Sequence, residues 1–415
     1  MKMLISAFAC HPKMGSEDGV GWGWVSNLAN HHEVHVITRK FRSPDIEAAL
    51  KEMPIDNLFF HYADPPSWLI FWKRGSRNFM PYAVLWQFFA LFLSVRLSFH
   101  HRFDIVQHLT YGNLWLPSFL FLIPGRYVWG PVGGGVVSAV YAKKYCLRDR
   151  FVELLRCFVQ RYLSWLNLPI LLSMARARVI LARTNETIGL LPKWARRKAI
   201  LLPETALDLS LFSYDDQQRY DVCRSAMFVF VYAGRILALK NLHLAITAYR
   251  ELLCRYPYLY GRVRFDIFGD GSYLSACRKL AGDEAGRSII FHGLIDRSTL
   301  FEKLREAHLF VHLSGKDTAA TAPMEAMALG LPVICLNIGG MGNLVDNSCG
   351  VILENSDPKN IIQEVVDAMY TLIENRERLL ELSLSARQKV EHSFCWERRI
   401  EQYNNILKKE FTEGI

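Results

Sequence analysis

The chain has 415 residues, which is enough for two or three domains of ordinary size. Apolar residues make up 51% and charged residues 21% of the sequence, and this composition excludes a disordered, collagen-like or coiled-coil chain. The nine cysteines are scattered without a Cys-x-x-Cys pair or a Cys/His cluster at metal-ligand spacing. We therefore expect reduced thiols and a cytoplasmic protein.

The net charge of +9 is divided unevenly between the two halves of the chain. Residues 1–200 contain 25 Lys and Arg against 12 Asp and Glu, whereas residues 201–415 contain 24 against 28. The basic first half indicates an anionic partner, such as phospholipid headgroups or a substrate that bears a pyrophosphate; a basic solvated surface is the alternative. Because no nucleic-acid recognition motif occurs, we expect no nucleic acid among the partners.

In the first 200 residues, short apolar runs alternate with helical patterns, which predicts a parallel sheet covered by helices. Met3–Cys10 is interpreted as a buried strand rather than a secretory signal, and a helix is expected over Val20–Ala29. Further strands are predicted at residues 33–39, 103–109, 126–132 and 177–183.

Two long uncharged stretches lie between these strands. Asn78–Val95 reaches the lower length limit of a bilayer span, but Pro81 and Gln87 interrupt it. Ile105–Gly125 is better explained as a strand followed by a buried helix.

A second alternation of strands and helices begins after residue 225, with helices predicted at Leu242–Arg255, Ser272–Ala281, Ser298–Glu306 and Pro323–Leu329. The fold class expected is therefore α/β, with two Rossmann-like doubly wound domains facing a central cleft. We place the first domain at residues 1–205, a polar hinge at 206–225 and the second domain at 226–395.

The first candidate site is a glycine-rich loop that follows the first strand, with glycines at 15, 19, 21 and 23. Glycines allow backbone N–H groups to approach an anion at the start of a helix. Their spacing is not Gly-x-Gly-x-x-Gly, and a tight strand-to-helix turn explains them equally well.

The second half carries basic and acidic groups after its strands. Arg235 and Lys240 follow its first strand, where a guanidinium and an ammonium suit a diphosphate; two solvated side chains are the alternative. Asp317 follows a later strand, and Glu325 comes eight positions on, in the first turns of a helix. Carboxylates there can accept hydrogen bonds from sugar hydroxyls, although Glu325 can also merely complement its helix terminus.

This combination of motifs resembles the retaining GT-B glycosyltransferases of glycosyltransferase family four, of the bacterial surface-polysaccharide type. The resemblance rests on Gly234-Arg235 with Lys240, on Asp317-x7-Glu325 followed by the run AMALGLPV, and on Asp266–Ser272 and Ile290–Leu300 between them. In the first half HPKMGSEDGVGW, FDIVQH and WGPVGGG resemble the family's acceptor domain, and FCWERRIEQY resembles the helix at 396–415 that crosses back to it.

The resemblance implies a role for each matched residue. The diphosphate is held by Arg235 and Lys240, the ribose by Glu325 and the transferred sugar by Asp317. Gly19 lies beneath the sugar phosphates and His108 faces the hexose, unless His108 is a core histidine. Backbone groups of His292, Gly293 and Leu294 contact the base. Two departures from the family pattern occur, Asp in place of Glu at 317 and Thr-Ala-Ala in place of a glycine-rich aromatic run.

The implied activity is transfer of a hexose-type sugar from a nucleotide-diphosphate sugar to a lipid-linked or polysaccharide acceptor in cell-surface glycan biosynthesis. No Asp-x-Asp occurs in the sequence, so we expect metal-independent transfer without a cofactor, with cationic side chains stabilising the leaving group. The resemblance implies retention of the anomeric configuration. Two alternatives stay open: a weakened sugar-nucleotide-binding scaffold subunit at the membrane, suggested by Asp317, and a GT-B sugar epimerase.

Two segments of the first half, 67–101 and 143–163, interleave aromatic residues with Lys and Arg. This pattern is typical of a surface that lies in a membrane interface beside anionic lipid, although the same residues can cover a sheet. We expect a peripheral protein on the inner face of the cytoplasmic membrane, with a lipid-linked saccharide as acceptor.

Overall fold

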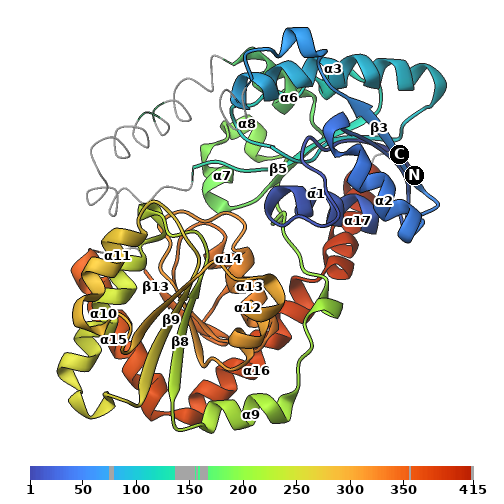
Figure 1. Cartoon of the computed structure of the whole chain (residues 1–415). Coiled ribbons are helices and arrows are strands. Elements are labelled where there is room, and N and C mark those ends of the chain that lie inside the picture. The colour runs from blue at the N-terminus through green and yellow to red at the C-terminus, as the bar shows by residue number, and fades with distance from the viewer. Residues whose placement is uncertain (74–78, 136–154, 156–157, 159–166, 355–356, 413–415) are drawn as a thin grey trace. The chain divides into compact units, whose positions relative to one another are not determined.

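The computed structural model describes residues 1–73, 79–135, 155, 158, 167–354 and 357–412, and these fall into two compact units. The first unit contains strands β1–β7 and the last helix, and the second contains strands β8–β13 with helices α9–α16 (Figure 1). The chain leaves the first unit after Ala206 and returns to it at Trp396.

Within the described residues, the first unit is built on a seven-stranded parallel sheet in the order β3-β2-β1-β4-β5-β6-β7. Its strands are β1 (Lys2–Ser6), β2 (Glu33–Arg39), β3 (Leu58–Ala63), β4 (Ile105–His108), β5 (Arg126–Val132), β6 (Val179–Ala182) and β7 (Ala199–Leu201). Its helices are α1 (Ser16–Leu28), α2 (Ser43–Glu52), α3 (Phe79–His100), α6 (Leu168–Arg176), α7 (Asn185–Leu190), α8 (Lys193–Arg196) and α17 (Trp396–Thr412).

The second unit has a parallel sheet in the order β10-β9-β8-β11-β12-β13. Its strands are β8 (Phe228–Ala233), β9 (Val263–Phe268), β10 (Ile289–Gly293), β11 (Leu309–His312), β12 (Val333–Leu336) and β13 (Gly350–Leu353). Its helices are α9 (Asp216–Arg224), α10 (Leu242–Arg255), α11 (Leu274–Ala281), α12 (Arg297–Arg305), α13 (Thr321–Ala328), α14 (Met341–Leu344), α15 (Pro358–Glu374) and α16 (Arg376–Ser393).

Both sheets share one topology. In each, the order from the third strand runs 3-2-1-4-5-6, so the direction of winding reverses between the first and fourth strands. Ligands of such sheets bind outside the carboxyl ends of the strands at this reversal. The predicted fold class of two Rossmann-like α/β domains is confirmed.

Buried apolar runs explain why these strands form. Every residue of β8 and of β11 is buried, as expected for strands covered by helices on both faces. Helix α10 spans the predicted residues, and its buried face includes Ala245, Tyr249 and Leu252. Side-chain caps begin several helices: Asp296 accepts from the Thr299 N–H at α12, and Asn375 accepts from the Arg378 N–H at α16.

Helix α17 packs against α1 of the first unit. A Cβ atom at Gly23 would lie 2.1 Å from Cζ2 of Trp396, so only glycine allows this contact. The ring of Trp24 meets that of Tyr403 edge to face at 5.3 Å between centroids. Residues from the end of the chain thus complete the core around α1.

The prediction of a buried helix after β4 is wrong. Between β4 and β5 the chain forms only the short 3-10 turn Leu120–Leu122. Tyr111 has a left-handed backbone with φ 56°, and the Asn113 side chain accepts from the N–H groups of Trp115 and Leu116. An Asx turn of this kind satisfies the backbone without a helix.

Helix α3 also differs from expectation, because Pro81 and Gln87 do not interrupt it. Pro81 lies in the first turn, where a helix needs no backbone N–H donor. The helix is long and apolar enough to cross a membrane, but a helix packed in a soluble core passes the same test. One face of α3 is buried against the first unit, through residues that include Tyr82, Trp86 and Leu97.

The opposite face of α3 carries an outer stripe, which we define as Phe88, Phe92, Val95 and Phe99. All four side chains are exposed, Phe92 to 71% and Phe99 to 82%. Their spacing of four, three and four residues places them along one side of the helix. Of the predicted basic segments, 143–163 lies outside the described residues except for Leu155 and Phe158, and Arg74 and Arg77 also lie outside them.

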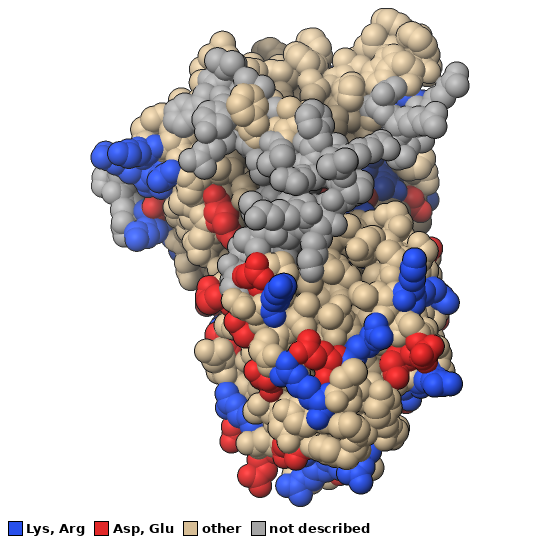
Figure 2. Space-filling view, turned by 90° about the vertical axis from the view of Figure 1, so that its left-hand side faces the viewer, with Lys and Arg blue, Asp and Glu red and all other residues tan. Residues whose placement is uncertain are grey.

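Residues 207–224, assigned above to the hinge, are part of the second unit. They include α9, which begins at the cap Asp215, and the buried Arg219, which donates to the carbonyl oxygens of Ala307 and His308. Charged side chains of both signs are interspersed over the visible face of the second unit, in the lower part of Figure 2.

Candidate active site

The basic loop of the second unit begins where β8 ends. Gly234 has φ 147°, and Arg235 after it is exposed. The next loop packs closely on this one: a Cβ atom at Gly269 would lie 2.0 Å from the Gly234 carbonyl oxygen, and one at Gly271 would lie 2.3 Å from that of Ile236. The glycines after β9 therefore bring two strand-end loops together.

Lys240, predicted to bind the diphosphate, contacts Asp317. Its Nζ lies 2.6 Å from Oδ2 of Asp317, across 77 residues of sequence. The same oxygen accepts a hydrogen bond of 2.8 Å from Nε2 of His312, and the other accepts from the Ala320 N–H. The structure thus brings two of the predicted residues together and adds His312 to them.

The partners of Asp317 set its ionisation. Burial by itself would raise the pKa of Asp317, but the hydrogen bond from His312 and the charge of Lys240 outweigh it and hold that pKa well below its usual range. Burial lowers the pKa of His312, and the Asp317 carboxylate opposes this. A carboxylate held by an ammonium and by a histidine is thus in place at the mouth of the sheet.

The backbone after Asp317 is strained. Ala320 has the left-handed conformation with φ 48°, which costs about 1 kcal/mol for a residue other than glycine. A Cβ atom at Gly340 would lie 2.6 Å from the Thr318 carbonyl oxygen, and the Gly340 N–H donates to the carbonyl of Asp317. The small residues at this turn allow the loop after β12 to pack directly on it.

Glu325 lies on α13 and is paired with a residue that sequence reasoning missed. Its Oε1 accepts a hydrogen bond of 2.6 Å from Arg297 at the start of α12. Burial raises the pKa of Glu325, and the Arg297 charge opposes the rise. Within the described residues, Oε2 of Glu325 accepts no hydrogen bond, so one carboxylate oxygen is available for a ligand.

The predicted base contacts lie at the end of β10. His292 donates a hydrogen bond of 3.0 Å to Asp266 on β9, and its ring stacks on Phe268 at 4.4 Å between ring centroids. The Gly293 carbonyl already accepts from the Gly269 N–H at 2.7 Å, and the Leu294 side chain is exposed. Asp266, not singled out from the sequence, fixes the His292 ring.

In the first unit, the glycine-rich segment belongs mostly to α1 and not to a loop, because the helix begins at Ser16. Gly19 and Gly21 have packing roles: a Cβ atom would lie 2.3 Å from the Met14 carbonyl oxygen at Gly19 and 2.0 Å from that of Ala9 at Gly21. The predicted role of Gly19 beneath the sugar phosphates remains a prediction.

His108 ends β4 and is fully buried. Neither ring nitrogen has a hydrogen-bond partner among the described residues, and burial lowers the pKa of His108 to about 4, so that the ring is neutral near pH 7. Its neighbours in register, Ser6 on β1 and Trp129 on β5, also carry buried polar atoms without a partner. This burial agrees with the core-histidine alternative.

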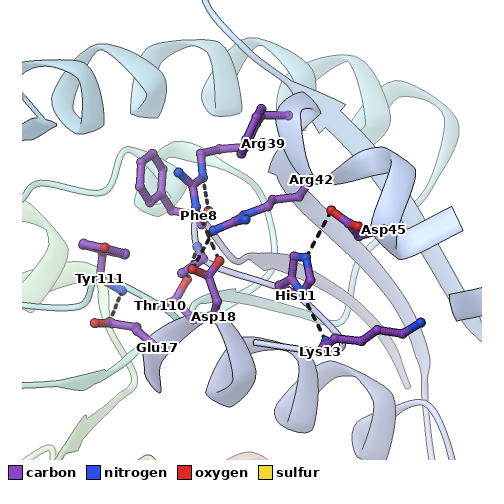
Figure 3. Close-up of polar contacts among 12 residues, drawn as sticks. Phe8, His11, Lys13, Glu17, Asp18, Arg39, Arg42, Asp45, Thr110 and Tyr111 are labelled. Atoms are coloured by element: carbon purple, nitrogen blue, oxygen red, sulfur yellow. Dashed lines mark hydrogen bonds and ion pairs between the residues drawn. The ribbon is translucent and has the colours of Figure 1, made fainter. Parts of the chain in front are cut away.

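Charged residues that sequence reasoning did not single out follow β1 and β2 in the first unit, and Thr110 and Tyr111 follow β4 beside them (Figure 3). Glu17 accepts from the Tyr111 N–H at 2.6 Å and from Arg183 at 3.0 Å, and Arg183 also pairs with the buried Glu204 at 2.7 Å. Burial raises the pKa of Glu204, and Arg183 opposes it. The hydrogen bond from Tyr111 ties the start of α1 to the segment after β4, and the ion pair with Arg183 ties it to the end of β6.

A second group in Figure 3 is centred on Asp18. Its Oδ2 lies 2.8 Å from Arg42 and its Oδ1 lies 3.4 Å from Arg39. Beside it, His11 lies 3.1 Å from Asp45. In the sequence, this group is indicated only by the positions of its members, since Asp18 follows β1 and Arg39 ends β2.

Comparison with known proteins gives a family match over most of the second unit. Residues 224–389 match the family described as glycosyl transferases group 1. D-inositol 3-phosphate glycosyltransferase from Geodermatophilus obscurus is 29% identical over 216 residues, which are 49% of this chain and 46% of that protein. The match thus spans less than half of the relative's length.

Solved structures share the fold over nearly the whole chain. HepE from Anabaena in complex with UDP-glucose has a TM-score of 0.59 at 14% identity and covers 99% of this chain and all of its own. WaaG, a glycosyltransferase involved in lipopolysaccharide biosynthesis, has a TM-score of 0.59 at 14% identity, over 97% of this chain and 99% of its own. The chain therefore has the GT-B fold, and its residues 224–389 resemble the glycosyl transferases group 1 family.

Proposed function

We propose that this protein is a retaining glycosyltransferase that moves a hexose-type sugar from a nucleotide-diphosphate sugar to a lipid-linked or polysaccharide acceptor. The observation that carries the proposal is the Asp317 carboxylate, which contacts both Lys240 and His312 within the matched domain. The complex of HepE with UDP-glucose supports a nucleotide-sugar donor, and the involvement of WaaG in lipopolysaccharide biosynthesis supports a surface glycan.

The cationic residues account for departure of the nucleotide. When the bond between the anomeric carbon and the diphosphate oxygen breaks, negative charge grows on the diphosphate. In this proposal Arg235 and Lys240 neutralise that charge, and Asp317, which also contacts His312, holds the Lys240 ammonium beforehand. Positioned charges need no reorganisation during the reaction, so they stabilise the transition state more than solvent does.

Retention follows from transfer on one face of the sugar. The departing phosphate oxygen takes the proton of the acceptor hydroxyl, and that hydroxyl oxygen bonds to the anomeric carbon from the side that the phosphate leaves. Glu325 holds the ribose through its free oxygen, with Arg297 fixing the other. We propose that this chemistry needs no metal, because side-chain cations supply the charge.

Donor hydrolysis tests the enzyme proposal most directly. A panel of nucleotide sugars is incubated with the chain without acceptor, and release of free sugar and nucleotide is measured. We expect release from at least one donor, unaffected by excess EDTA. Binding of a donor without release or transfer would support a scaffold subunit instead, and epimerised donor would indicate the epimerase. Loss of activity in EDTA that manganese restores would contradict metal independence.

A surface of the first unit supports a peripheral position on the inner face of the cytoplasmic membrane. Helices α3 and α6 both lie in the upper part of Figure 1. The exposed Arg96 follows Val95 of the outer stripe, and the first unit exposes further apolar side chains. These side chains include Trp68, Phe71, Leu122, Leu168 and Leu172.

Co-sedimentation with liposomes tests the membrane proposal. Binding is expected to require anionic lipid and to weaken with salt, because apolar insertion and charge attraction act together. Replacing Phe92 and Phe99 by Ser removes two of the most exposed rings and is expected to lower binding at least fivefold. Tyr260→Ser, on an exposed ring of the second unit, is the matched control. Equal binding by all variants, or none to anionic vesicles at low salt, would contradict this location.

A further inference from the structure

Arg39 and Arg42 form a basic pair in the first unit that the donor chemistry does not use. Arg39 ends β2, and Arg42 ends the 3-10 turn that follows it. Their side chains are only 10% and 12% exposed, and both point to Asp18 on α1 (Figure 3). Within the described residues, Asp18 is the one carboxylate that forms an ion pair with either of these nearly buried guanidinium groups.

The contacts of this pair compensate its positive charge only in part. The contact of Arg39 with Asp18 is long, at 3.4 Å, and its Nε is used by the Phe8 carbonyl oxygen at 2.8 Å. Arg42 donates one hydrogen bond to Asp18, while its buried Nε has no partner among the described residues. A buried positive charge without full compensation is costly, so this arrangement favours an added anion.

The surroundings of the pair suit an anion carried on a larger molecule. The Lys73 ammonium lies 3.8 Å from the Tyr82 ring centroid, and burial followed by repulsion from Arg39 lowers the pKa of Lys73. Tyr111 packs on Phe8 at 5.0 Å between ring centroids. The Arg39 guanidinium carbon lies 4.4 Å from the centroid of that Phe8 ring. Cations therefore stand beside aromatic rings.

We infer that Arg39 and Arg42 bind a phosphate or diphosphate group of the acceptor substrate, as two planar guanidinium forks on one oxyanion. Guanidinium groups match phosphate oxygens in bidentate fashion. Both arginines come from the carboxyl end of β2, at the edge where ligands of such sheets bind. The inference rests on the proposed function, because it assigns the acceptor side of that reaction, and it makes a phosphorylated acceptor the substrate class.

Calorimetric titration of the full chain with inorganic pyrophosphate tests the site. The wild type is expected to show two classes of binding, one at Arg39 and Arg42 and one at Lys240. Arg42→Gln is expected to weaken the first class at least tenfold and Lys240→Ala the second. Lys40→Gln removes an exposed charge from the same 3-10 turn and is the matched control.

The outcomes separate the two proposals. If Arg42→Gln and Lys40→Gln both bind as the wild type does, the acceptor site is overturned while the donor site can still stand. If only Lys240→Ala is without effect, the donor assignment fails while the acceptor site stands. Arg42→Lys keeps the charge but not the planar fork, so intermediate affinity is expected even where Arg42→Gln does not fold.

The substitution Asp18→Asn is expected to change pyrophosphate affinity in the opposite direction. Removing the carboxylate leaves the guanidinium pair more positive, so pyrophosphate is expected to bind several-fold more tightly at low salt. A purely structural ion pair predicts no gain in a folded variant, and that result would overturn the proposal.

Geranyl diphosphate, geraniol and glucose 1-phosphate then identify the source of the phosphate. If the acceptor is lipid-linked, geranyl diphosphate is expected to bind more tightly than pyrophosphate, and this gain should depend on Arg42. If the acceptor is a soluble sugar phosphate, glucose 1-phosphate is expected to bind more tightly than pyrophosphate, again in dependence on Arg42. Binding of geraniol that equals that of its diphosphate would contradict recognition of the phosphate.

Discussion

His108 and His312 hold the same place in two sheets of one topology, yet they differ in every contact. Each is the last residue of a four-residue strand, and each strand is the fourth of its unit. His312 donates to Asp317, which also holds Lys240, whereas His108 has no partner among the described residues. The shared topology thus places a histidine at the end of the fourth strand, and the loop that follows the strand determines whether a charged partner is available to that histidine.

The loops after the first strand of each sheet differ in the same way. In the first unit this segment places Glu17 and Asp18 at the start of α1, and the cations come from β2 and β6. In the second unit it places Arg235 and Lys240 there, and the carboxylate comes from the loop after β11. The two units therefore present opposite charges at the same topological position.

The largest effect is expected for the free energy of unfolding in acid, and it depends on His108. Because the folded pKa is about 4 and the unfolded one about 6.5, the unfolded chain takes up a proton first as the pH falls. This histidine is thus expected to remove about 2 kcal/mol of unfolding free energy between pH 7 and pH 4.5. His108→Leu is expected to flatten the dependence by that amount in urea titrations.

The same variant also tests the role that the family resemblance implies for His108. A folded His108→Leu protein with an unchanged acid slope would contradict the pKa. Loss of sugar transfer with intact donor hydrolysis would support a position facing the sugar.

The second prediction concerns Lys240. Lys240→Ala is expected to lower kcat/KM at least about tenfold, or about 1.4 kcal/mol, because the ammonium on the leaving diphosphate is lost. Lys279→Ala, which removes an exposed lysine of α11, is the control. Near-normal turnover and donor affinity in Lys240→Ala would remove this residue from the site.

Glu325 is expected to act on donor binding. Glu325→Ala is expected to weaken nucleotide affinity about tenfold, since a carboxylate oxygen for the ribose hydroxyls is lost, and equilibrium binding of the donor nucleotide measures this. Glu302→Ala on α12 removes an exposed carboxylate and serves as control. If Arg297→Ala weakens binding and Glu325→Ala does not, the ion pair and not the carboxylate contacts the ligand.

The smallest effect is expected at His312, where the same substitution by leucine can be compared with that at His108. His312→Leu removes the hydrogen bond to Asp317 and is expected to lower kcat about threefold with little change in nucleotide affinity. His312→Gln can still donate to Asp317 and is expected to restore most of the loss. Equal effects of His312→Leu and His108→Leu on donor hydrolysis would show that the contact with Asp317 is immaterial.

The strands and several helices followed from the sequence because their signals are local. A buried parallel strand needs a continuous apolar run, as in β8 and β11, and α10 has the apolar spacing of a half-buried helix. The helix predicted after β4 failed because Asn113 satisfies the backbone with its own side chain, which an apolar count does not register. Pro81 was misjudged for a related reason, since its effect depends on where the helix begins.

Sequence alone determined the two-sheet fold, the order of the motifs and the identity of Lys240, Asp317 and Glu325 as candidates. Only the tertiary structure decided their partners: His312 for Asp317, Arg297 for Glu325, and one carboxylate for both Arg39 and Arg42. It likewise assigned Gly23 to the packing of Trp396, which comes from the end of the chain. The reason is physical, because apolar periodicity acts between neighbours in sequence, whereas ion pairs and close contacts depend on which strand ends the fold brings to one edge.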